Sequence, residues 1–293
     1  MTSMPAATRH GSMLQMLVAA LALLTSGAAG AQQGDNLGLE LVDPKVLRVC
    51  SDPSNMPFSN ERGEGFENKL AELFAGKLDK KLAYTWYPQS TGFVRQTLGA
   101  FRCDVIMGFP QGNDLVQSTN PYYRSVYALL VRPGSDLEGV EQLGDARLSG
   151  RHIGIVAGTP PATHLVAHGL MSTAKPYSLV VDTRVDSVGL AMTKDIASGA
   201  IDAGILWGPI AGYFARRSDP PLRVVPLLNE SGGPSLAYRI TMGVRPTDQN
   251  WKRELNELIR DNQPAITTLL LGYGLPLLDE NGRIIPLPPA AKP

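Results

Sequence analysis

Three features are scarce in this sequence: apolar runs that could cross a membrane, an excess of one charge, and catalytic motifs. Outside the first 31 residues no stretch is apolar enough to span a bilayer, which argues against a membrane-embedded protein. The 293 residues carry 27 basic and 27 acidic side chains, so no overall field would steer nucleic acid or anionic lipid to the surface. We therefore expect no nucleic-acid partner and no membrane insertion of the mature chain.

The motifs of several enzyme classes are also missing. The sequence has no G-x-S-x-G turn, no G-x-x-x-x-G-K-[ST] loop and no dinucleotide fingerprint, and its carboxylates are scattered rather than paired. His164 and His168 have the spacing of a two-histidine metal pair, but no Glu follows His164 and no third ligand is evident. A solvated helix face explains both histidines better. We expect a protein that is not an enzyme and holds no metal or cofactor of its own.

The N-terminus has the pattern of an export signal. Arg9 precedes an apolar core over residues 13–24 that is too short to span a bilayer, and Ala29-Gly30-Ala31 resembles a cleavage site. Residues 1–31 are therefore predicted to be a signal peptide, and the mature chain to begin near Gln32 in the periplasm. Removing Arg9 from the 27 basic residues leaves 26 against 27 acidic ones. No heptad repeat is present, which favours a monomer.

Only two cysteines are present, Cys50 and Cys103. An oxidising compartment favours a disulfide between them. If Cys50 ends one strand and Cys103 begins the neighbouring strand, however, an offset of three residues separates them by roughly 10 Å, too far for a bond. The alternatives are a disulfide or two small buried apolar residues. Because a free thiol is a hazard outside the cell, we favour the disulfide.

The stretch from Leu47 to Leu78 is the clearest structural unit of the chain. A short apolar run is followed by a polar loop with Pro53 and Pro57, and then Phe66, Leu70 and Phe74 recur at helical spacing with Glu67 and other charged residues between them. Strand, long loop and helix form the first half of a parallel α/β unit. In such sheets ligands bind at the carboxyl ends of the strands, where this loop lies.

Further strands and helices alternate along the chain in two series. Each series ends in a strand that resembles a crossing from one lobe to the other, at residues 126–132 and 237–244. We predict lobe 1 over residues 32–132 plus 238–278, lobe 2 over 133–237, and an extended proline-rich tail over 279–293. Individual expected elements are helices at 93–102, 162–168, 250–260 and 264–273, and strands at 104–108, 177–181 and 203–207.

The motifs, taken in order, resemble a known family. LRVCSDPSNMPFSN, RCDVIMG, NPYYRSVYALLVRPGS, LSGRHIGIVAGT and YRITMGVRP are similar to the type II periplasmic solute-binding proteins, across residues 46–276. CDVIMGFPQG, AGTPPATHLVAHGLMSTAKPY, DAGILWGPIAGYFA and NQPAITTLLLGYGLPLLDE resemble one branch, the J proteins (MxaJ and XoxJ) found beside methanol dehydrogenases. The resemblance implies a two-lobed α/β fold with two crossover strands and a role in methanol metabolism.

The sequence departs from the amino-acid binders of that family. They carry G-x-T-x-T-x-x-R after their third strand, where this chain has Pro110 and Gly112 in the threonine slots and Leu115 in the arginine slot. Their ammonium-binding aspartate would fall on Trp207. Without these anchors the cleft has lost charge-assisted contacts of about 1.5–3 kcal/mol each. An aromatic and apolar mouth remains, which suits a protein segment or a flat apolar ligand better than a zwitterion.

The candidate cleft residues lie at the predicted strand ends and loops. Several of these residues also have a simpler alternative role. Asp52 would be a loop cap. Trp207 and Phe109 would be core residues, and the tyrosines at 122 and 123 would pack near the hinge. Gly158 and Thr159 would form a turn and an N-cap whose free N–H groups could hold an anion. The full set is Asp52, Phe58, Phe109, Pro110, Gln111, Tyr122, Tyr123, Gly158, Thr159, Trp207 and Pro209.

Two functions from different classes are consistent with these features. The resemblance implies a non-enzymatic accessory protein that holds a PQQ-dependent methanol dehydrogenase in its cleft during maturation or activation, with PQQ and calcium or a lanthanide bound by the partner. The alternative is the solute receptor of an ABC importer for a small polar or aromatic molecule.

Overall fold

The computed structural model describes residues 40–287, so the predicted signal peptide lies outside the described part of the chain. Its first group of strands is parallel: β1 (Val46–Ser51) lies between β4 (Lys81–Trp86) and β5 (Val105–Pro110). Helix α1 (Phe66–Lys77) connects β1 to β4 and buries Phe66, Leu70 and Phe74 against them. The predicted strand, loop and helix unit is therefore present.

A second parallel group follows in the chain. β8 (Ile153–Val156) pairs with β9 (Lys175–Tyr177) on one side and with β10 (Ala203–Trp207) on the other. The helices that connect or follow these strands are α3 (Pro160–Ala167), α4 (Val188–Ser198) and α5 (Gly208–Ala215). Each half has its own apolar core, because Leu47, Val105 and Trp251 belong to one cluster and Ile153, Ile205 and Leu165 to another.

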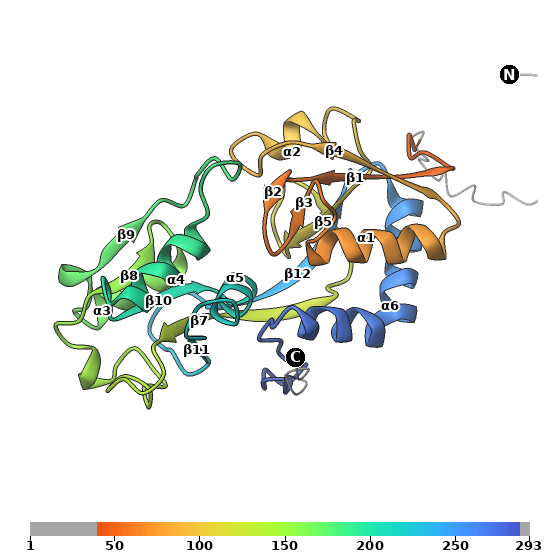
Figure 1. Ribbon diagram of the computed structural model, residues 1–293. Coiled ribbons are helices and arrows are strands. Elements are labelled where there is room, and N and C mark those ends of the chain that lie inside the picture. Colours follow the sequence, from red (N-terminus) through yellow and green to blue (C-terminus); the bar gives the residue numbers. More distant parts are fainter. Residues whose placement is uncertain (1–39, 288–293) are drawn as a thin grey trace, which may run out of the picture. The chain divides into compact units, whose positions relative to one another are not determined.

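Two long strands join the halves. β7 (Tyr123–Val131) and β12 (Ala237–Val244) pair antiparallel with each other, and the sheet runs in the order β4-β1-β5-β12-β7-β10-β8-β9. In Figure 1 both strands lie between the two groups. The fold class is as predicted, an α/β type II binding-protein fold with two crossover strands. The lobe boundaries at 132/133 and 237/238 stay a prediction, since the sheet is continuous there.

The remaining elements are short. They are the hairpin β2 (Ser54–Asn55) and β3 (Ser59–Asn60), helix α2 (Phe93–Gln96), β6 (Gln117–Ser118), β11 (Arg223–Pro226), and two 3₁₀ turns at Ala146–Leu148 and Met171–Thr173.

The two C-terminal helices predicted from the sequence are one helix, α6 (Gln249–Gly272), with Pro264 inside it. A proline removes one backbone hydrogen bond and was expected to end the first helix. The helix continues because Trp251, Leu255, Ile266 and Leu270 bury one continuous stripe on both sides of Pro264. Tertiary packing outweighs the local cost of the proline.

Other predicted boundaries were wrong. The helix expected at residues 93–102 is α2, which ends at Gln96, and the strand expected at 177–181 ends at Tyr177. The tail is not simply extended, because Leu278 and Ile284 pair across a turn in which the Asp279 amide donates to the carbonyl of Arg283. Residues 288–293 lie outside the described range.

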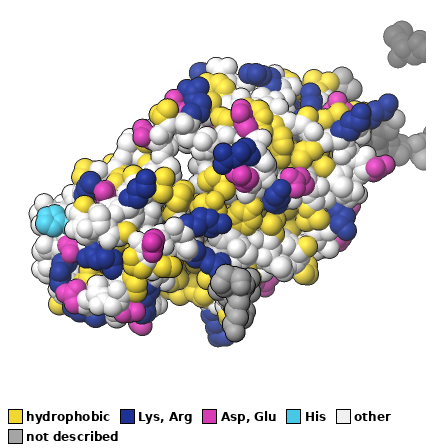
Figure 2. Space-filling model, in the orientation of Figure 1, with side chains coloured by type: hydrophobic (Ala, Val, Ile, Leu, Met, Phe, Trp, Pro, Cys, Tyr) yellow, Lys and Arg dark blue, Asp and Glu magenta, His cyan; other side chains and the backbone are white. Residues whose placement is uncertain are grey.

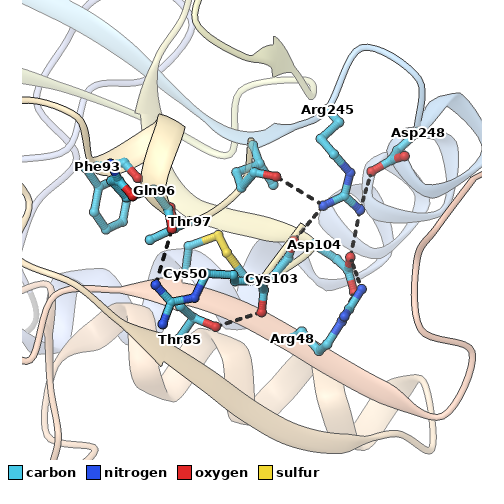
Figure 3. The surroundings of a disulfide bond; sticks show 12 residues. Arg48, Cys50, Thr85, Phe93, Gln96, Thr97, Cys103, Asp104, Arg245 and Asp248 are labelled. Carbon is cyan, nitrogen blue, oxygen red and sulfur yellow. Dashed lines mark hydrogen bonds and ion pairs between the residues drawn. A yellow bond between two sulfur atoms is a disulfide. The ribbon is translucent and has the colours of Figure 1, made fainter. Parts of the chain in front are cut away.

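A disulfide joins Cys50 and Cys103, with 5.4 Å between their Cα atoms (Figure 3). The premise of the register argument against it was wrong, because Cys103 is not part of β5, which begins at Val105. The chain approaches β5 from the side of β4, where the Thr85 hydroxyl donates to the carbonyl of Arg102. Thr85 lies opposite Cys50, so this approach brings Cys103 level with Cys50.

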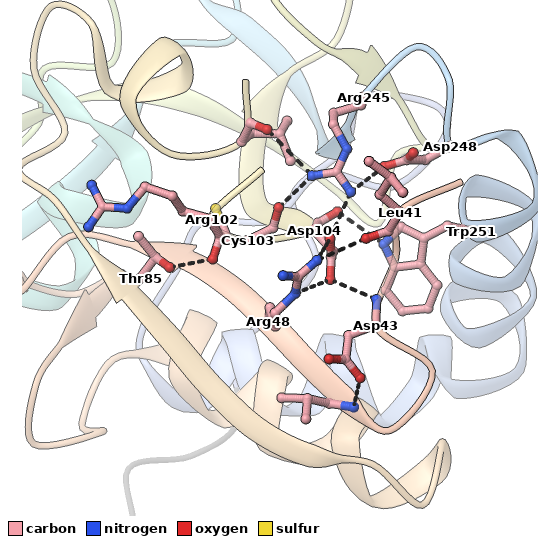
Figure 4. A network of polar contacts seen from close by, with 12 residues as sticks. Leu41, Asp43, Arg48, Thr85, Arg102, Cys103, Asp104, Arg245, Asp248 and Trp251 are labelled. Atoms are coloured by element: carbon pink, nitrogen blue, oxygen red, sulfur yellow. Dashed lines mark hydrogen bonds and ion pairs between the residues drawn. The ribbon is translucent and has the colours of Figure 1, made fainter. Parts of the chain in front are cut away.

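The residue after the disulfide, Asp104, binds two guanidinium groups (Figure 4). Arg48 donates from Nε and Nη2 to both carboxylate oxygens at 2.7 Å, and Arg245 donates from Nη2 to Oδ1 at 2.7 Å. Arg245 also donates to the carbonyl of Cys103 and pairs with Asp248 at 2.7 Å. We call Arg48, Asp104 and Arg245 the Asp104 corner; it ties β1, β5 and the end of β12 together.

Candidate functional site

A pocket with a volume of about 290 Å³ lies where the loop after β1 and the end of β5 face strands β7, β10 and β12. Five of the predicted cleft residues line it: Phe58, Phe109, Pro110, Tyr123 and Trp207. Thr159 lines an adjoining pocket together with Phe58 and Trp207. The structure thus brings together residues from both halves of the sheet, at the carboxyl ends of parallel strands. Their role in binding stays a prediction.

Three aromatic rings form one wall of the pocket. Trp207 at the end of β10 lies directly opposite Tyr127 in β7, and Tyr238 follows at the start of β12. Their ring centroids are 5.3 Å apart for Tyr127 and Trp207, 5.9 Å for Trp207 and Tyr238, and 6.4 Å for Tyr127 and Tyr238, with interplanar angles of 62°, 77° and 75°. Edge-to-face contacts at these distances are favourable for aromatic pairs.

A buried carboxyl also lines the pocket. Glu67 lies in the first turn of α1 and is 8% exposed. Its side chain fits because the facing residue, Gly108 in β5, has no Cβ, and a Cβ there would overlap with the Glu67 carboxylate oxygen. Burial, and to a smaller degree the negative charge of Asp52, raises the pKa of the Glu67 carboxyl to about 8.

Asp52 is almost fully buried, and its role is mainly that of a cap. Its carboxylate accepts from the backbone N–H groups of Ser54 and Gln89, which order the loop after β1. It also accepts from the Thr183 hydroxyl at 2.9 and 3.1 Å. Thr183 belongs to the second half of the chain, so this hydrogen bond connects the two sides of the cleft.

Besides Asp52 and Gly158, three predicted residues line neither pocket. The Tyr122 hydroxyl is buried and donates to the carbonyl of Met107 at 2.8 Å, Pro209 is buried in the first turn of α5, and Gln111 is exposed beyond the end of β5. The prediction was wrong for Tyr122 because successive side chains of an extended chain point to opposite faces, and the side chain of its neighbour Tyr123 lies on the cleft side. A strand end can be predicted from sequence more easily than the face of each residue.

The start of α3 does not offer the anion site that the sequence suggested. Gly158 has the positive φ expected of a turn, and Thr159 occupies the N-cap position. The Thr159 hydroxyl, however, donates back to the carbonyl of Val156 at 2.6 Å instead of capping the helix. Pro160 and Pro161 have no N–H group, and the Ala162 amide bonds to Thr159, so the first helical positions have no free donor.

Sequence reasoning missed several residues of the pocket. They are Glu67, Gln89, Gly108, Tyr127, Pro160, Tyr238 and Ile240. Glu67 was assigned to the polar side of its helix, and Tyr127 and Tyr238 were hidden within strands interpreted only as crossings. The available signal was that aromatic residues occur in both crossing strands, which must pass beside the cleft.

The two histidines of α3 differ in their surroundings. His164 is buried, and its Nε2 lies 2.9 Å from the carbonyl of Pro234, so the prediction of a solvated face was wrong for this residue. The ring fills the space beside Gly233. The side chain of His168 is partly exposed, and its Nε2 lies 3.5 Å from Oε2 of Glu230. Within residues 40–287, no group of three His, Cys, Asp or Glu side chains is arranged to hold a metal ion.

The surface shown in Figure 2 carries basic and acidic side chains interspersed, with hydrophobic side chains between them. Among the described residues, no helix is both long enough and apolar enough to cross a membrane.

Comparison with known proteins relates the whole chain to a family of binding proteins. No family model matches the chain. Protein MoxJ of Methylorubrum extorquens is 29% identical over 292 residues, which cover 92% of this chain and 96% of MoxJ. The crystal structure of MxaJ from Methylophaga aminisulfidivorans is 27% identical and has a TM-score of 0.68, covering 79% of this chain and 100% of that one. An ancestral cationic amino acid solute-binding protein, 19% identical with a TM-score of 0.61, shares the fold alone.

The periplasmic binding protein XoxJ from Methylobacterium extorquens carries the most weight, because its crystal structure matches both the fold and the sequence. It is 44% identical, the match covers 80% of this chain and 100% of that one, and the TM-score is 0.69. The chain therefore belongs to the family of periplasmic binding proteins that includes MoxJ, XoxJ and MxaJ.

Proposed function

We propose that this chain is a non-enzymatic periplasmic accessory protein that binds a PQQ-dependent methanol dehydrogenase and assists its maturation or activation. The observation that carries the proposal is the chemistry of the cleft. Among the described residues, the lining of the aromatic pocket and of the adjoining pocket includes no lysine and no arginine. A free amino acid would find no cationic partner for its carboxylate there, as the substitutions at Pro110, Leu115 and Trp207 predicted.

The mouth of the cleft has the character of a docking surface. Leu179 lines the adjoining pocket and is 57% exposed, and Val185, six residues later in the same loop, is 77% exposed. Leu115, which borders the loop after β5, is also exposed. Exposed apolar side chains on loops that border the cleft favour a protein partner over solvent. A partner that lacks its cofactor would be stabilised by such binding.

The cofactors would belong to the dehydrogenase. PQQ and a calcium or lanthanide ion are expected on the partner, and the accessory protein would release it once they are in place. The proposed role therefore requires tighter binding to the cofactor-free dehydrogenase than to the loaded enzyme.

Co-elution of the purified chain with the dehydrogenase tests the proposal. We expect binding of the cofactor-free dehydrogenase at micromolar concentration and at least tenfold weaker binding of the loaded form. Leu179→Asp should weaken binding at least tenfold, because Leu179 lines the adjoining pocket and a charge there would be buried in the apolar interface. Val166→Asp is the matched control, since Val166 is similarly exposed at 62% on α3 and does not line either pocket. Absence of binding to the cofactor-free form would contradict the proposal.

The pocket volume favours a second candidate, the solute receptor of an importer, because it is close to the lower end of the ~300–1,000 Å³ range of small-molecule sites. A solute at a hundred times its Kd should add about 2.7 kcal/mol to the stability of the fold. Thermal-shift screening of the isolated chain separates this candidate from a docking role.

A further inference from the structure

Apart from Gln89, which accepts a hydrogen bond from Asn55, the polar side chains that line the aromatic pocket have no partner among the described residues. Among residues 40–287, no hydrogen bond is made by the Glu67 carboxyl, by the hydroxyls of Tyr123, Tyr127 and Tyr238, or by the indole N–H of Trp207, whereas the hydroxyl of the neighbouring Tyr122 is fully satisfied. These polar atoms are not fully buried, because none of them is among the buried side-chain atoms that lack a partner; they are open to the pocket instead. A ligand in the pocket could therefore bind them directly.

The walls indicate which charge that ligand carries. Tyr127, Trp207 and Tyr238 are inclined to one another at 62–77°, which makes a corner of three aromatic rings, and Phe58 and Tyr123 line the pocket with them. Aromatic faces are negative and attract cations. Among the described residues that line the pocket, Glu67 is the only carboxylic acid, and there is no lysine, arginine or histidine. The pocket would therefore repel an anion.

The same walls argue against a metal ion or another inorganic cation. Hard cations need several oxygen ligands, and the pocket offers one carboxyl among rings and the apolar side chains of Pro110 and Ile240. Such a surface suits a cation that is itself covered with methyl or methylene groups. A cavity of about 290 Å³ limits that cation to a small molecule.

We propose that the aromatic pocket binds a small organic cation, a methylated amine or quaternary ammonium ion, held against Tyr127, Trp207 and Tyr238 with Glu67 as its counter-charge. The ammonium lies over the ring faces, as in other aromatic cages, and the carboxyl of Glu67 faces it from the first turn of α1. Gly108 is required because it leaves room for that carboxyl. The proposal does not rest on the dehydrogenase partnership, because the binding is a property of the isolated chain.

Protonation of Glu67 gives the proposal a second signature. In the empty pocket the raised pKa, about 8, keeps this carboxyl neutral at pH 7. The titratable groups that interact with it are Asp52 directly after β1, Tyr84 in β4, Tyr122 directly before β7 and Tyr123 in β7, and none is a base. A bound cation favours the ionised form, so binding releases a proton. The affinity should rise up to tenfold per pH unit below pH 8 and level off above it.

Isothermal titration of the purified chain with choline and with 3,3-dimethylbutan-1-ol tests the proposal. The two molecules have nearly the same shape, but only choline is charged. We expect choline to bind at least tenfold more tightly, with an affinity that rises between pH 6 and pH 8. Tetramethylammonium and trimethylamine are further probes, because the cavity is small. Equal affinity for the charged and neutral isosteres, or no binding of any of these cations at millimolar concentration, would overturn the proposal.

Variants separate the pocket from general effects. Glu67→Gln should weaken choline binding at least tenfold and remove its pH dependence, and Tyr238→Leu should weaken it while leaving the pH dependence in place. Glu72→Gln is the matched control, since Glu72 lies on the exposed side of the same helix and pairs with Lys69. Unchanged choline binding in Glu67→Gln would contradict the proposal even if the wild-type chain binds choline.

Discussion

The Asp104 corner and the aromatic pocket each contain a buried carboxyl, but only one of these carboxyls is paired. Asp104 is 1% exposed and its carboxylate is bound by Arg48 and Arg245, whereas Glu67 is 8% exposed and its carboxyl makes no hydrogen bond with any described residue. Removing one partner of a buried ion pair destabilises a fold, and a buried carboxyl without a partner also costs stability unless a ligand supplies one. The contrast therefore supports a structural role for the corner and the proposed binding role for the pocket.

Asp104→Asn removes the charge of the paired carboxyl and should have the largest effect on folding stability. Arg245 is almost fully buried and would lose one of its two carboxylate partners. Removing one member of a buried ion pair typically costs about 3–5 kcal/mol, and we expect a loss of this size in urea unfolding at pH 7. Asp145→Asn, which removes an exposed pair with Arg147, is the control and should change stability little. Equal losses in both variants would mean that burial does not distinguish them.

Removal of the disulfide tests the same corner by a different route. The bond joins residues 53 positions apart, and its loss in Cys50→Ala/Cys103→Ala should cost about 2–4 kcal/mol, chiefly by freeing the unfolded chain. Thermal unfolding with and without reductant provides the measurement. Reductant should lower the transition temperature of the wild type and leave that of the double variant unchanged.

Glu67→Gln should raise the stability of the fold, whereas Asp104→Asn should lower it. An unfolded glutamate ionises near the ordinary pKa of 4.5, whereas the folded carboxyl ionises near 8. Between these values the folded state holds a proton that the unfolded state has lost, so this group lowers stability as pH rises from about 4.5 to 8. Glutamine does not titrate, and the variant should be more stable than the wild type by about 3 kcal/mol at pH 7.

Urea unfolding of both proteins at pH 5, 7 and 8 measures this difference, which should be small at pH 5 and level off above pH 8. A variant that is less stable than the wild type at pH 8 would show that Glu67 has a partner within the fold. The pair of results from Asp104→Asn and Glu67→Gln thus decides whether the two carboxyls differ as described.

Local patterns predicted the architecture well, because helical spacing in residues 66–78 and alternating strands and helices follow directly from which side chains must be buried. They failed at α6, where the stripe from Trp251 to Leu270 continues through Pro264. The favoured disulfide is confirmed, but the register argument against it failed, since the path of the chain before Asp104 depends on contacts with Thr85 of another strand. Both failures come from tertiary contacts that no local pattern contains.

The site was predictable only in part. Phe109 and Trp207 follow from their place at strand ends, where parallel sheets bind ligands. Glu67 could not be found this way, because its burial depends on Gly108 of another strand, which has no side chain and so leaves room for the carboxyl. Tyr127 and Tyr238 face the pocket because β7 and β12 pair antiparallel in one particular register. The most informative residues were those whose surroundings come from distant segments.

The smallest expected effect concerns the contact that joins the two sides of the cleft. Thr183→Val removes the hydroxyl that donates to Asp52, but Asp52 keeps its two backbone partners at Ser54 and Gln89. We expect a loss of about 1 kcal/mol, and therefore about fivefold faster amide hydrogen exchange in residues 178–186 if this bond holds the loop against the cleft. Thr183→Ser keeps the donor and should exchange like the wild type. Because Thr183 lies outside the Asp104 corner, Thr183→Val should leave exchange in β1 and β5 unchanged; faster exchange there would mean that the cleft and the corner are not energetically separate.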